Sequence, residues 1–310
     1  MERFIGVFSL LGGFTLAGTS VIAGRFVSEI LGTFTIAAVS LFFALLGLLP
    51  LCARNLVQAI RQMPIRDWAS LLVQALFGIF LFRMFLLQGL IRTSAGEAGV
   101  LTGATPAVTV VLARLILKEP LDMLRLLGVV STVTGILVLQ GVFLTDIGFS
   151  REHLIGNLLV LCAAMCESLF NVISRISSIK ASLNQSQELN PTVQTTLVVG
   201  IALLLCLGPA LGENPVNSLM SLGIAGWGAL VWYGVFVTAL AFILWYAGIK
   251  RCDISVAAAF SGMMPFTALV LSVMLLDEQP GWQQWLGGLI VVIGMVLTGS
   301  KLPAVRQENC

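Results

Sequence analysis

The chain has 310 residues, of which 58% are hydrophobic and 10% are charged, and its formal net charge is +2. Soluble domains carry about 25% charged residues, so this composition excludes a water-soluble domain and favours a chain whose solvent is lipid. The small net charge also excludes the dense basic surface that nucleic acid requires, so we expect no nucleic-acid partner.

Apolar stretches separated by charges or turn residues run along the whole chain. Each is long enough to cross about 30 Å of hydrocarbon as a helix. The predicted fold class is an all-α membrane protein with ten transmembrane helices, at residues 4–24, 32–53, 68–90, 96–117, 124–144, 154–174, 189–211, 221–249, 254–276 and 282–299. Ten such helices leave short loops and no room for a soluble catalytic domain, so we expect no enzymatic activity.

Metal and cofactor chemistry are not expected either. The chain has six cysteines and one histidine. No C-x-x-C pair occurs, and Cys162 and Cys166 would supply two of the four ligands that structural zinc requires. A phosphate-binding loop is also absent from the sequence, which excludes direct drive by ATP.

The distribution of basic residues predicts the orientation. If the N-terminus is cytoplasmic, 13 of the 17 Lys and Arg residues fall on the cytoplasmic side. Arg25, Arg92 and Arg151 fall on the opposite side, and Arg83 lies within a span. Cytoplasmic loops are enriched in Lys and Arg. We therefore predict a multi-pass protein of the bacterial inner membrane with both termini in the cytoplasm, in contact with membrane lipid.

The sequence matches itself at two offsets. An offset of 150 aligns Gly6 and Arg25 with Gly156 and Arg175, and an offset of 159 aligns the residue pairs Trp68/Trp227, Gly89/Gly248, Arg92/Arg251, Gly103/Gly262, Pro106/Pro265, Glu119/Glu278, Gly128/Gly287 and Gly135/Gly294. This predicts two five-helix repeats, 1–145 and 152–300, followed by a cytoplasmic tail at 301–310. Because five is odd, the second repeat is inverted in the membrane, as in many secondary transporters.

Each half also carries a proline within a span, a glutamate thirteen residues on, and two glycines seven residues apart. This pattern resembles the EamA domain of the drug/metabolite transporter (DMT) superfamily, and the resemblance covers nearly the whole chain. It implies a ten-helix exporter of metabolites whose central cavity is lined by helices 1, 3, 4, 6, 8 and 9. The chain departs from the family where an aromatic residue is frequent in the first helix of each repeat, with Ala17 and Glu167 at these places.

Glu167 is the most deeply placed acid in the predicted spans. Asn171 and Ser174 follow it by one and two helical turns, so the three residues share one face of helix 6. Ionisable groups at bilayer depth usually have a function. We predict that Glu167 and Asn171 bind substrate, with Glu167 either pairing with an amine or exchanging a proton. The alternative is a structural pair with Arg114 or Arg175.

Arg83 and Glu97 lie on either side of the turn between helices 3 and 4, at similar depth. A salt bridge between them, which stabilises the fold or closes an outer gate, is the leading interpretation, because buried charges are generally paired. Alternatively, Arg83 binds a substrate carboxylate, since guanidinium presents a fork of donors.

The remaining candidates are aromatic, thioether and proline residues. Trp232, Phe236 and Met264 are candidates for an apolar substrate-binding wall, with plain packing as the alternative. Pro106 and Pro265 lie mid-span, where each removes a backbone hydrogen bond and permits a hinge or a static kink.

Two functions of different classes follow. The first is an alternating-access exporter of small metabolites such as amino acids, with protons as a candidate coupling ion. The second is a flippase for a lipid-linked intermediate, or an accessory subunit without transport activity. In either case the sequence is compatible with a monomer or a homodimer.

Overall fold

The computed structural model describes residues 2–118, 121–139, 151–183, 190–249, 251, 260 and 262–299. Within these ranges the chain forms helices and no strand. Helices are expected in lipid because they satisfy their own backbone hydrogen bonds. Glu119, the junction between the predicted repeats and the tail at 301–310 lie outside the described residues.

The first predicted repeat contains helices that follow the expected spans. Several spans are interrupted, so one span often comprises two or three consecutive elements. They are α1 (Glu2–Gly18), α2 (Ser20–Ser28), α3 (Thr33–Gln62), α4 (Ile65–Ala75), η1 (Leu76–Leu81), α5 (Phe82–Leu90), α6 (Ala95–Thr102), α7 (Thr105–Ile116) and α8 (Met123–Leu139). The element η1 is π-helical.

The second predicted repeat is built in the same way, with a second π-helical element, η2. Its elements are α9 (Arg151–Leu183), α10 (Pro191–Leu211), α11 (Pro215–Met220), α12 (Ile224–Val231), η2 (Trp232–Leu240), α13 (Ala241–Ile249), α15 (Met263–Leu276) and α16 (Trp282–Gly299). The short helix α11 lies in a segment where we expected a loop.

Eight helical segments of the described chain are long and apolar enough to cross a membrane. They correspond to eight of the ten predicted spans. The other two predicted spans are represented by the shorter apolar helices α8 and α15. Each predicted span extends into residues outside the described ranges, at 140–144 for the first and at 254–259 and 261 for the second.

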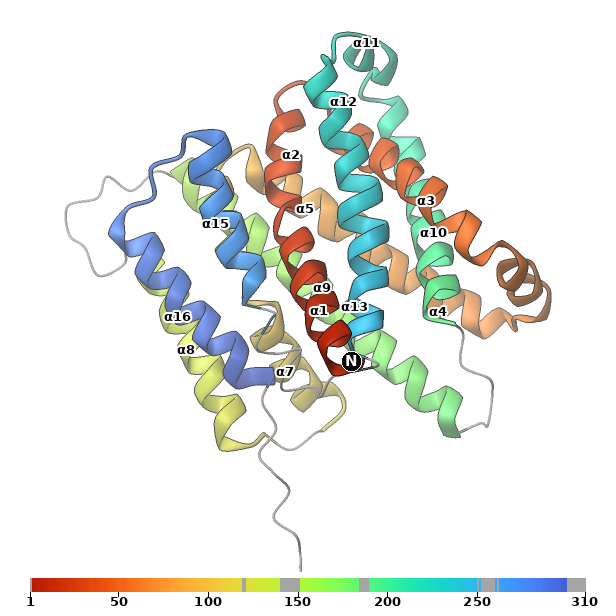
Figure 1. Ribbon diagram of the computed structural model, residues 1–310, viewed down its shortest axis with the longest axis horizontal. Helices are drawn as coiled ribbons and strands as arrows, with labels where there is room; N and C mark the ends of the chain where they lie inside the picture. The colour runs from red at the N-terminus through yellow and green to blue at the C-terminus, as the bar shows by residue number, and fades with distance from the viewer. Residues whose placement is uncertain are drawn as a thin grey trace, which may run out of the picture.

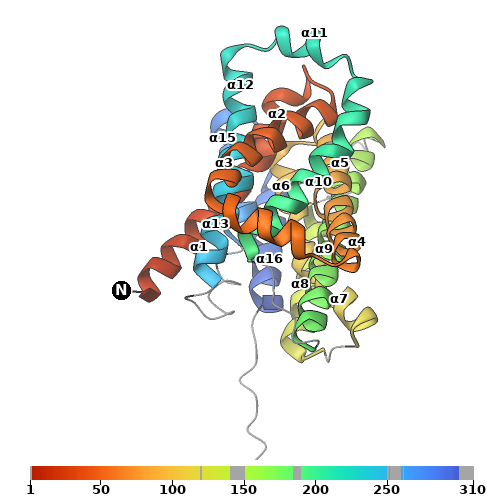
Figure 2. The same cartoon turned by 90° about the vertical axis from the view of Figure 1, so that its right-hand side faces the viewer.

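The bundle has two paired edges and a central group of helices (Figure 1). The helices α8 and α16 lie side by side at one edge, and α3 packs with α10 at the other, while α1, α9 and α13 lie between them. Figure 2 views the α3–α10 edge and shows α11 at one end of the bundle. The start of α1 and the end of α16 lie at the same end.

Glycines hold α8 and α16 close together. A methyl group on Gly128 would lie 2.8 Å from the Gly294 carbonyl oxygen, and one on Gly294 would lie 2.8 Å from that of Gly128. Gly135 and Gly287 are related in the same way, at 2.8 and 2.7 Å. Because low numbers in α8 meet high numbers in α16, the two helices run antiparallel. Small residues permit this close approach of backbones in membranes.

Local signals explain several helix ends. Ser94 caps α6 by accepting a hydrogen bond from the backbone N–H of Glu97 at 3.2 Å. Asn190 caps α10 in the same way, because its side-chain oxygen accepts a hydrogen bond from the backbone N–H of Thr192 at 3.0 Å. The helices α7 and α15 are each followed by a residue in the left-handed conformation, Lys118 (φ 55°) and Asp277 (φ 53°).

Candidate functional site

The carboxylate of Glu167 contacts the break in the fourth predicted span. Thr105, the first residue of α7, donates its hydroxyl to Glu167 Oε2 at 2.9 Å. The neighbouring Ser168 hydroxyl donates to the Thr105 carbonyl oxygen at 3.0 Å, which fixes α9 against the start of α7. Glu167 is half-buried. Its proposed pairing with Arg114 or Arg175 stays a prediction, because the side chain of Arg175 lies outside the described residues.

The rest of the polar stripe on α9 has a different environment. Asn171 is exposed on the surface of the bundle. The buried hydroxyl of Ser174 has no hydrogen-bond partner within the described part of the chain. Within one helical turn of α9, the polar face thus changes from the hydrogen-bonded carboxylate of Glu167 to the exposed amide of Asn171.

The aromatic candidates lie beside the break between α1 and α2. The rings of Trp232 and Phe236 stack with their centroids 4.6 Å apart. Trp232 Nε1 donates to the hydroxyl of Thr19, the residue between α1 and α2, at 2.8 Å. Met264 lies close by, since a methyl group on Gly18 would lie 2.6 Å from the Met264 carbonyl oxygen. Trp232, Phe236 and the Met264 backbone thus lie near the same break, and their role as an apolar substrate-binding wall stays a prediction.

Arg83 is buried, and its contacts are with neutral groups. Its guanidinium donates to the hydroxyl of Ser40 in α3 and, at 2.7 Å, to that of Thr238 in η2. It also lies 4.3 Å from the centroid of the Tyr233 ring. The expected salt bridge between Arg83 and Glu97 is therefore wrong. The two residues lie on either side of the turn between α5 and α6, but their side chains contact different helices.

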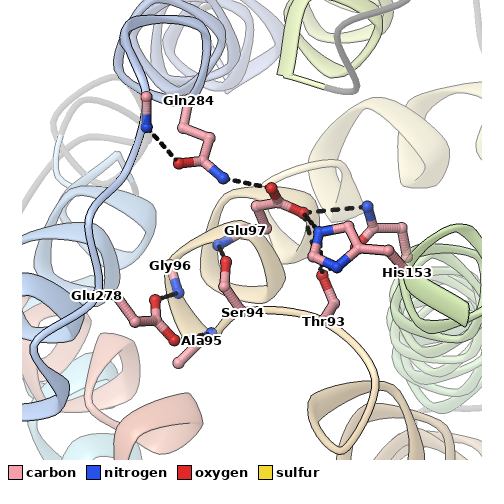
Figure 3. Close-up of polar contacts among 10 residues, drawn as sticks. Thr93, Ser94, Ala95, Gly96, Glu97, His153, Glu278 and Gln284 are labelled. Atoms are coloured by element: carbon pink, nitrogen blue, oxygen red, sulfur yellow. Dashed lines mark hydrogen bonds and ion pairs between the residues drawn. The ribbon is translucent and has the colours of Figure 1, made fainter. Parts of the chain in front are cut away.

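Glu97 instead lies at the centre of a buried polar cluster (Figure 3). Its Oε2 lies 2.7 Å from His153 Nε2 and accepts hydrogen bonds from Asn157 and Thr93, each at 3.1 Å. Its Oε1 accepts from Gln284. One carboxylate thus joins the starts of α6, α9 and α16. Sequence reasoning missed His153, Asn157 and Gln284 because each lies more than 50 residues from Glu97.

Two other glutamates cap helices from a distance. Glu278 accepts from the backbone N–H groups of Ala95 and Gly96 at 2.7 and 3.0 Å (Figure 3). Glu213, which the sequence analysis did not single out, accepts from the N–H groups of Phe34 and Thr35 at 3.1 and 2.8 Å. A carboxylate at a helix N-terminus satisfies orphan donors and interacts favourably with the helix dipole.

The prolines lie at helix starts. Pro106 is in the first turn of α7, after the interruption that separates α6 from α7. Pro265 is in the first turn of α15, which begins at Met263 after Gly262. First-turn N–H groups have no partner within their own helix. The expected mid-helix kink at Pro106 is thus a break between two helices, and its role as a hinge stays a prediction.

Comparison with known proteins decides the family. The model of the EamA-like transporter family matches twice, at residues 4–140 and 154–300. The chain belongs to this family. Together with its apolar helices, this makes it a multi-pass membrane transporter of the DMT superfamily.

Relatives of this EamA protein are themselves named as transporters. It is 28% identical to the uncharacterized transporter YetK of Bacillus subtilis, over 94% of this chain and 86% of that protein. It is 26% identical to the uncharacterized transporter YyaM of the same organism, over 79% of this chain and 77% of YyaM. A crystal structure shares the fold with a TM-score of 0.61 and 21% identity, covering 96% of this chain and 95% of the other.

Proposed function

We propose that this EamA protein is a secondary transporter that exports small metabolites such as amino acids by alternating access. The proposal rests on helix contacts between the two halves of the chain. Each of these contacts occurs twice, because exchanging the matching residues of the two halves gives a second contact that is also present. Such duplication is what two inverted repeats would produce, and it provides two equivalent ways of closing one central path.

The contacts between α8 and α16 have this property. The offset of 159 pairs Gly128 with Gly287 and Gly135 with Gly294. Exchanging the halves turns the contact between Gly128 and Gly294 into the contact between Gly287 and Gly135. In both contacts a methyl group on either glycine would lie 2.7–2.8 Å from the carbonyl oxygen of its partner. This reciprocity is typical of a two-fold axis. Because α8 and α16 run antiparallel, the axis would lie across the helices, as inverted repeats require.

A second pair of contacts follows the same rule. A methyl group on Gly89 in α5 would lie 3.0 Å from the Gly156 carbonyl oxygen in α9. One on Gly248 in α13 would lie 3.2 Å from that of Gly6 in α1. The repeat aligns Gly89 with Gly248 and Gly156 with Gly6. The matching left-handed residues Lys118 and Asp277, also 159 apart, support the same relation.

Glu167 is the group that we propose for coupling. It lies in a span long enough to cross the membrane, and the hydrogen bond described for it comes from the neutral hydroxyl of Thr105. A carboxylate in such a place can bind a substrate amine or carry a proton through the cycle. Its contact with the first residue of α7 would transmit a change of charge to the break beside Pro106.

We further propose that the protein lies in the bacterial inner membrane with both termini in the cytoplasm, as a monomer or a homodimer. The count of Lys and Arg supports this orientation. The start of α1 and the end of α16 lie at one end of the bundle, which agrees with termini on the same side of a membrane (Figure 1).

Counterflow in liposomes tests the transport proposal. The purified protein is reconstituted in vesicles loaded with unlabelled amino acids or cationic drugs, and uptake of the labelled counterparts is measured. We expect saturable exchange for one chemical class. Absence of exchange across the panel, from protein of native size and stability, would contradict the proposal and turn attention to lipid-linked substrates or an accessory role.

The Glu167→Gln variant tests coupling separately. It keeps the shape of the side chain and a hydrogen bond with Thr105 but cannot ionise. We expect it to reconstitute normally and to lose uptake driven by a pH gradient. If its uptake keeps the pH dependence of the wild type, Glu167 is not the coupling group.

A further inference from the structure

Arg83 is a buried positive charge without an acidic partner among the residues that the structure describes. It lies within the segment Asp67–Leu90, which is long and apolar enough to cross a membrane, and its relative exposure is 5%. No carboxylate lies within ion-pair distance of it in the part of the chain that the structure describes. Burying an unpaired charge is costly, so intramembrane arginines are usually retained for a function.

The surroundings hold the guanidinium in place without neutralising it. The Ser40 hydroxyl, which accepts from Arg83, donates to the Ile36 carbonyl oxygen at 2.7 Å, and the Thr238 hydroxyl donates to the Tyr233 carbonyl oxygen at 2.8 Å. Both hydroxyls therefore present a lone pair to Arg83. The Tyr233 ring contributes a cation–π contact at 4.3 Å.

Donors remain for an anion. A guanidinium has five N–H donors, and the hydrogen bonds described here use one on Nη1 and one on Nη2. A carboxylate can accept two parallel hydrogen bonds from such a fork, and charge-assisted bonds of this kind are stronger than neutral ones. Within the described ranges the guanidinium thus has no bidentate anionic partner.

The position of Arg83 relative to the two π-helical elements also points to a ligand. Arg83 follows η1 by two residues, and its partners Thr238 and Tyr233 both belong to η2. The offset of 159 carries η1 onto positions within η2, so both halves have a π-helical segment at the same place. Such segments are rare and occur frequently at functional sites.

Only the first half of the protein has an arginine at this place. The position matching Arg83 in the second half is Phe242. The repeated fold itself therefore does not require an arginine at this place, which argues against a purely architectural role.

We propose that Arg83 binds the carboxylate of the transported solute, so that the substrates are organic carboxylates, including zwitterionic amino acids. This proposal rests on the transport function proposed above and narrows its substrate class. Cationic drugs and simple amines, which lack a carboxylate, would not be held at this site.

Matched pairs of ligands test the proposal on the intact protein. Leucine and phenylalanine are compared with leucinamide and phenylalaninamide, which replace the carboxylate with a neutral amide. The measurements are competition against labelled amino acid in counterflow and the rise in melting temperature of the purified protein. We expect the wild type to prefer each acid over its amide by about ten-fold or more, a factor that corresponds to about 1.4 kcal/mol.

Two variants test whether Arg83 causes the preference for acid over amide. Arg83→Gln should remove the preference for acid over amide in both measurements, and Phe242→Leu, at the matching position of the other half, should keep it. Equal binding of acids and amides by the wild type, or a preference that survives in Arg83→Gln, would overturn the proposal. If Arg83→Gln does not fold, the wild-type comparison still decides whether a carboxylate is required.

The outcomes separate this proposal from the transport function. Exchange of cationic drugs alone would overturn the carboxylate site and leave transport standing. Stabilisation by acids without any exchange, lost in Arg83→Gln, would support the site and contradict transport. Neither exchange nor stabilisation would reject both.

Discussion

The contact between α8 and α16 offers a direct test of the packing. In Gly135→Ala, the added methyl group would lie 2.8 Å from the Gly287 carbonyl oxygen and 2.8 Å from the Val291 backbone nitrogen. Ordinary contacts begin near 3.4 Å. Backbone atoms cannot rotate away, so the helices must separate by roughly half an ångström or more. Overpacking of this kind costs about 1–3 kcal/mol.

Gly200→Ala is the matched control. Gly200 also lies inside an apolar helix, α10, but a methyl group there meets no atom within 4 Å. Both substitutions gain about 0.8–1 kcal/mol of helix propensity. The difference between them therefore isolates the clash.

Melting temperatures of the two variants in detergent, followed by size-exclusion chromatography after heating, measure this difference. We expect Gly135→Ala to melt several degrees below wild type and Gly200→Ala to melt at or above it. Equal melting temperatures for the two variants would refute the close packing of α8 against α16.

Three further predictions concern the polar contacts. Glu278→Ala removes the cap from the Ala95 and Gly96 N–H groups, and it should destabilise the protein by about 1 kcal/mol in thermal melts, whereas an unchanged melting temperature would rule out a stabilising cap. Glu97→Ala leaves the donors of the polar cluster without their shared acceptor and should lower the free energy of unfolding by about 1–3 kcal/mol. If Glu97→Gln recovers most of this stability, the hydrogen bonds matter more than the charge. Trp232→Phe keeps the stacking with Phe236 but removes the hydrogen bond to Thr19, so we expect the free energy of unfolding to fall by about 0.5–1.5 kcal/mol. If Trp232→Ala lowers it by the same amount, the aromatic packing contributes nothing.

Most helices could be placed from the sequence. A segment that crosses hydrocarbon must be apolar over about 20 residues, and the charges and turn residues between such segments mark their ends. The predicted span 282–299 coincides with α16, and the predicted span 189–211 differs from α10 by two residues at its start. The repeat also paired Gly128 with Gly287 and Gly135 with Gly294, the four glycines that meet between α8 and α16.

The partners of the polar side chains could not be obtained in this way. Counting residues along a span gives the depth of a side chain, but the direction in which it leaves the helix has meaning only once the neighbouring helices are in place. The residue count predicted a similar depth for Arg83 and Glu97, and they were paired for that reason. Tertiary packing instead turns Arg83 toward α3 and η2 and Glu97 toward α9 and α16.

The sequence alone thus determined which segments are long and apolar enough to cross a membrane and which residues match at the offset of 159, because both are encoded by local composition and spacing. Only the tertiary structure decided that His153 and Gln284 meet Glu97, that Glu278 caps α6, and that Arg83 has no acid beside it among the described residues. These contacts join residues far apart in the chain, and they depend on the rotation of each helix about its own axis, which packing sets.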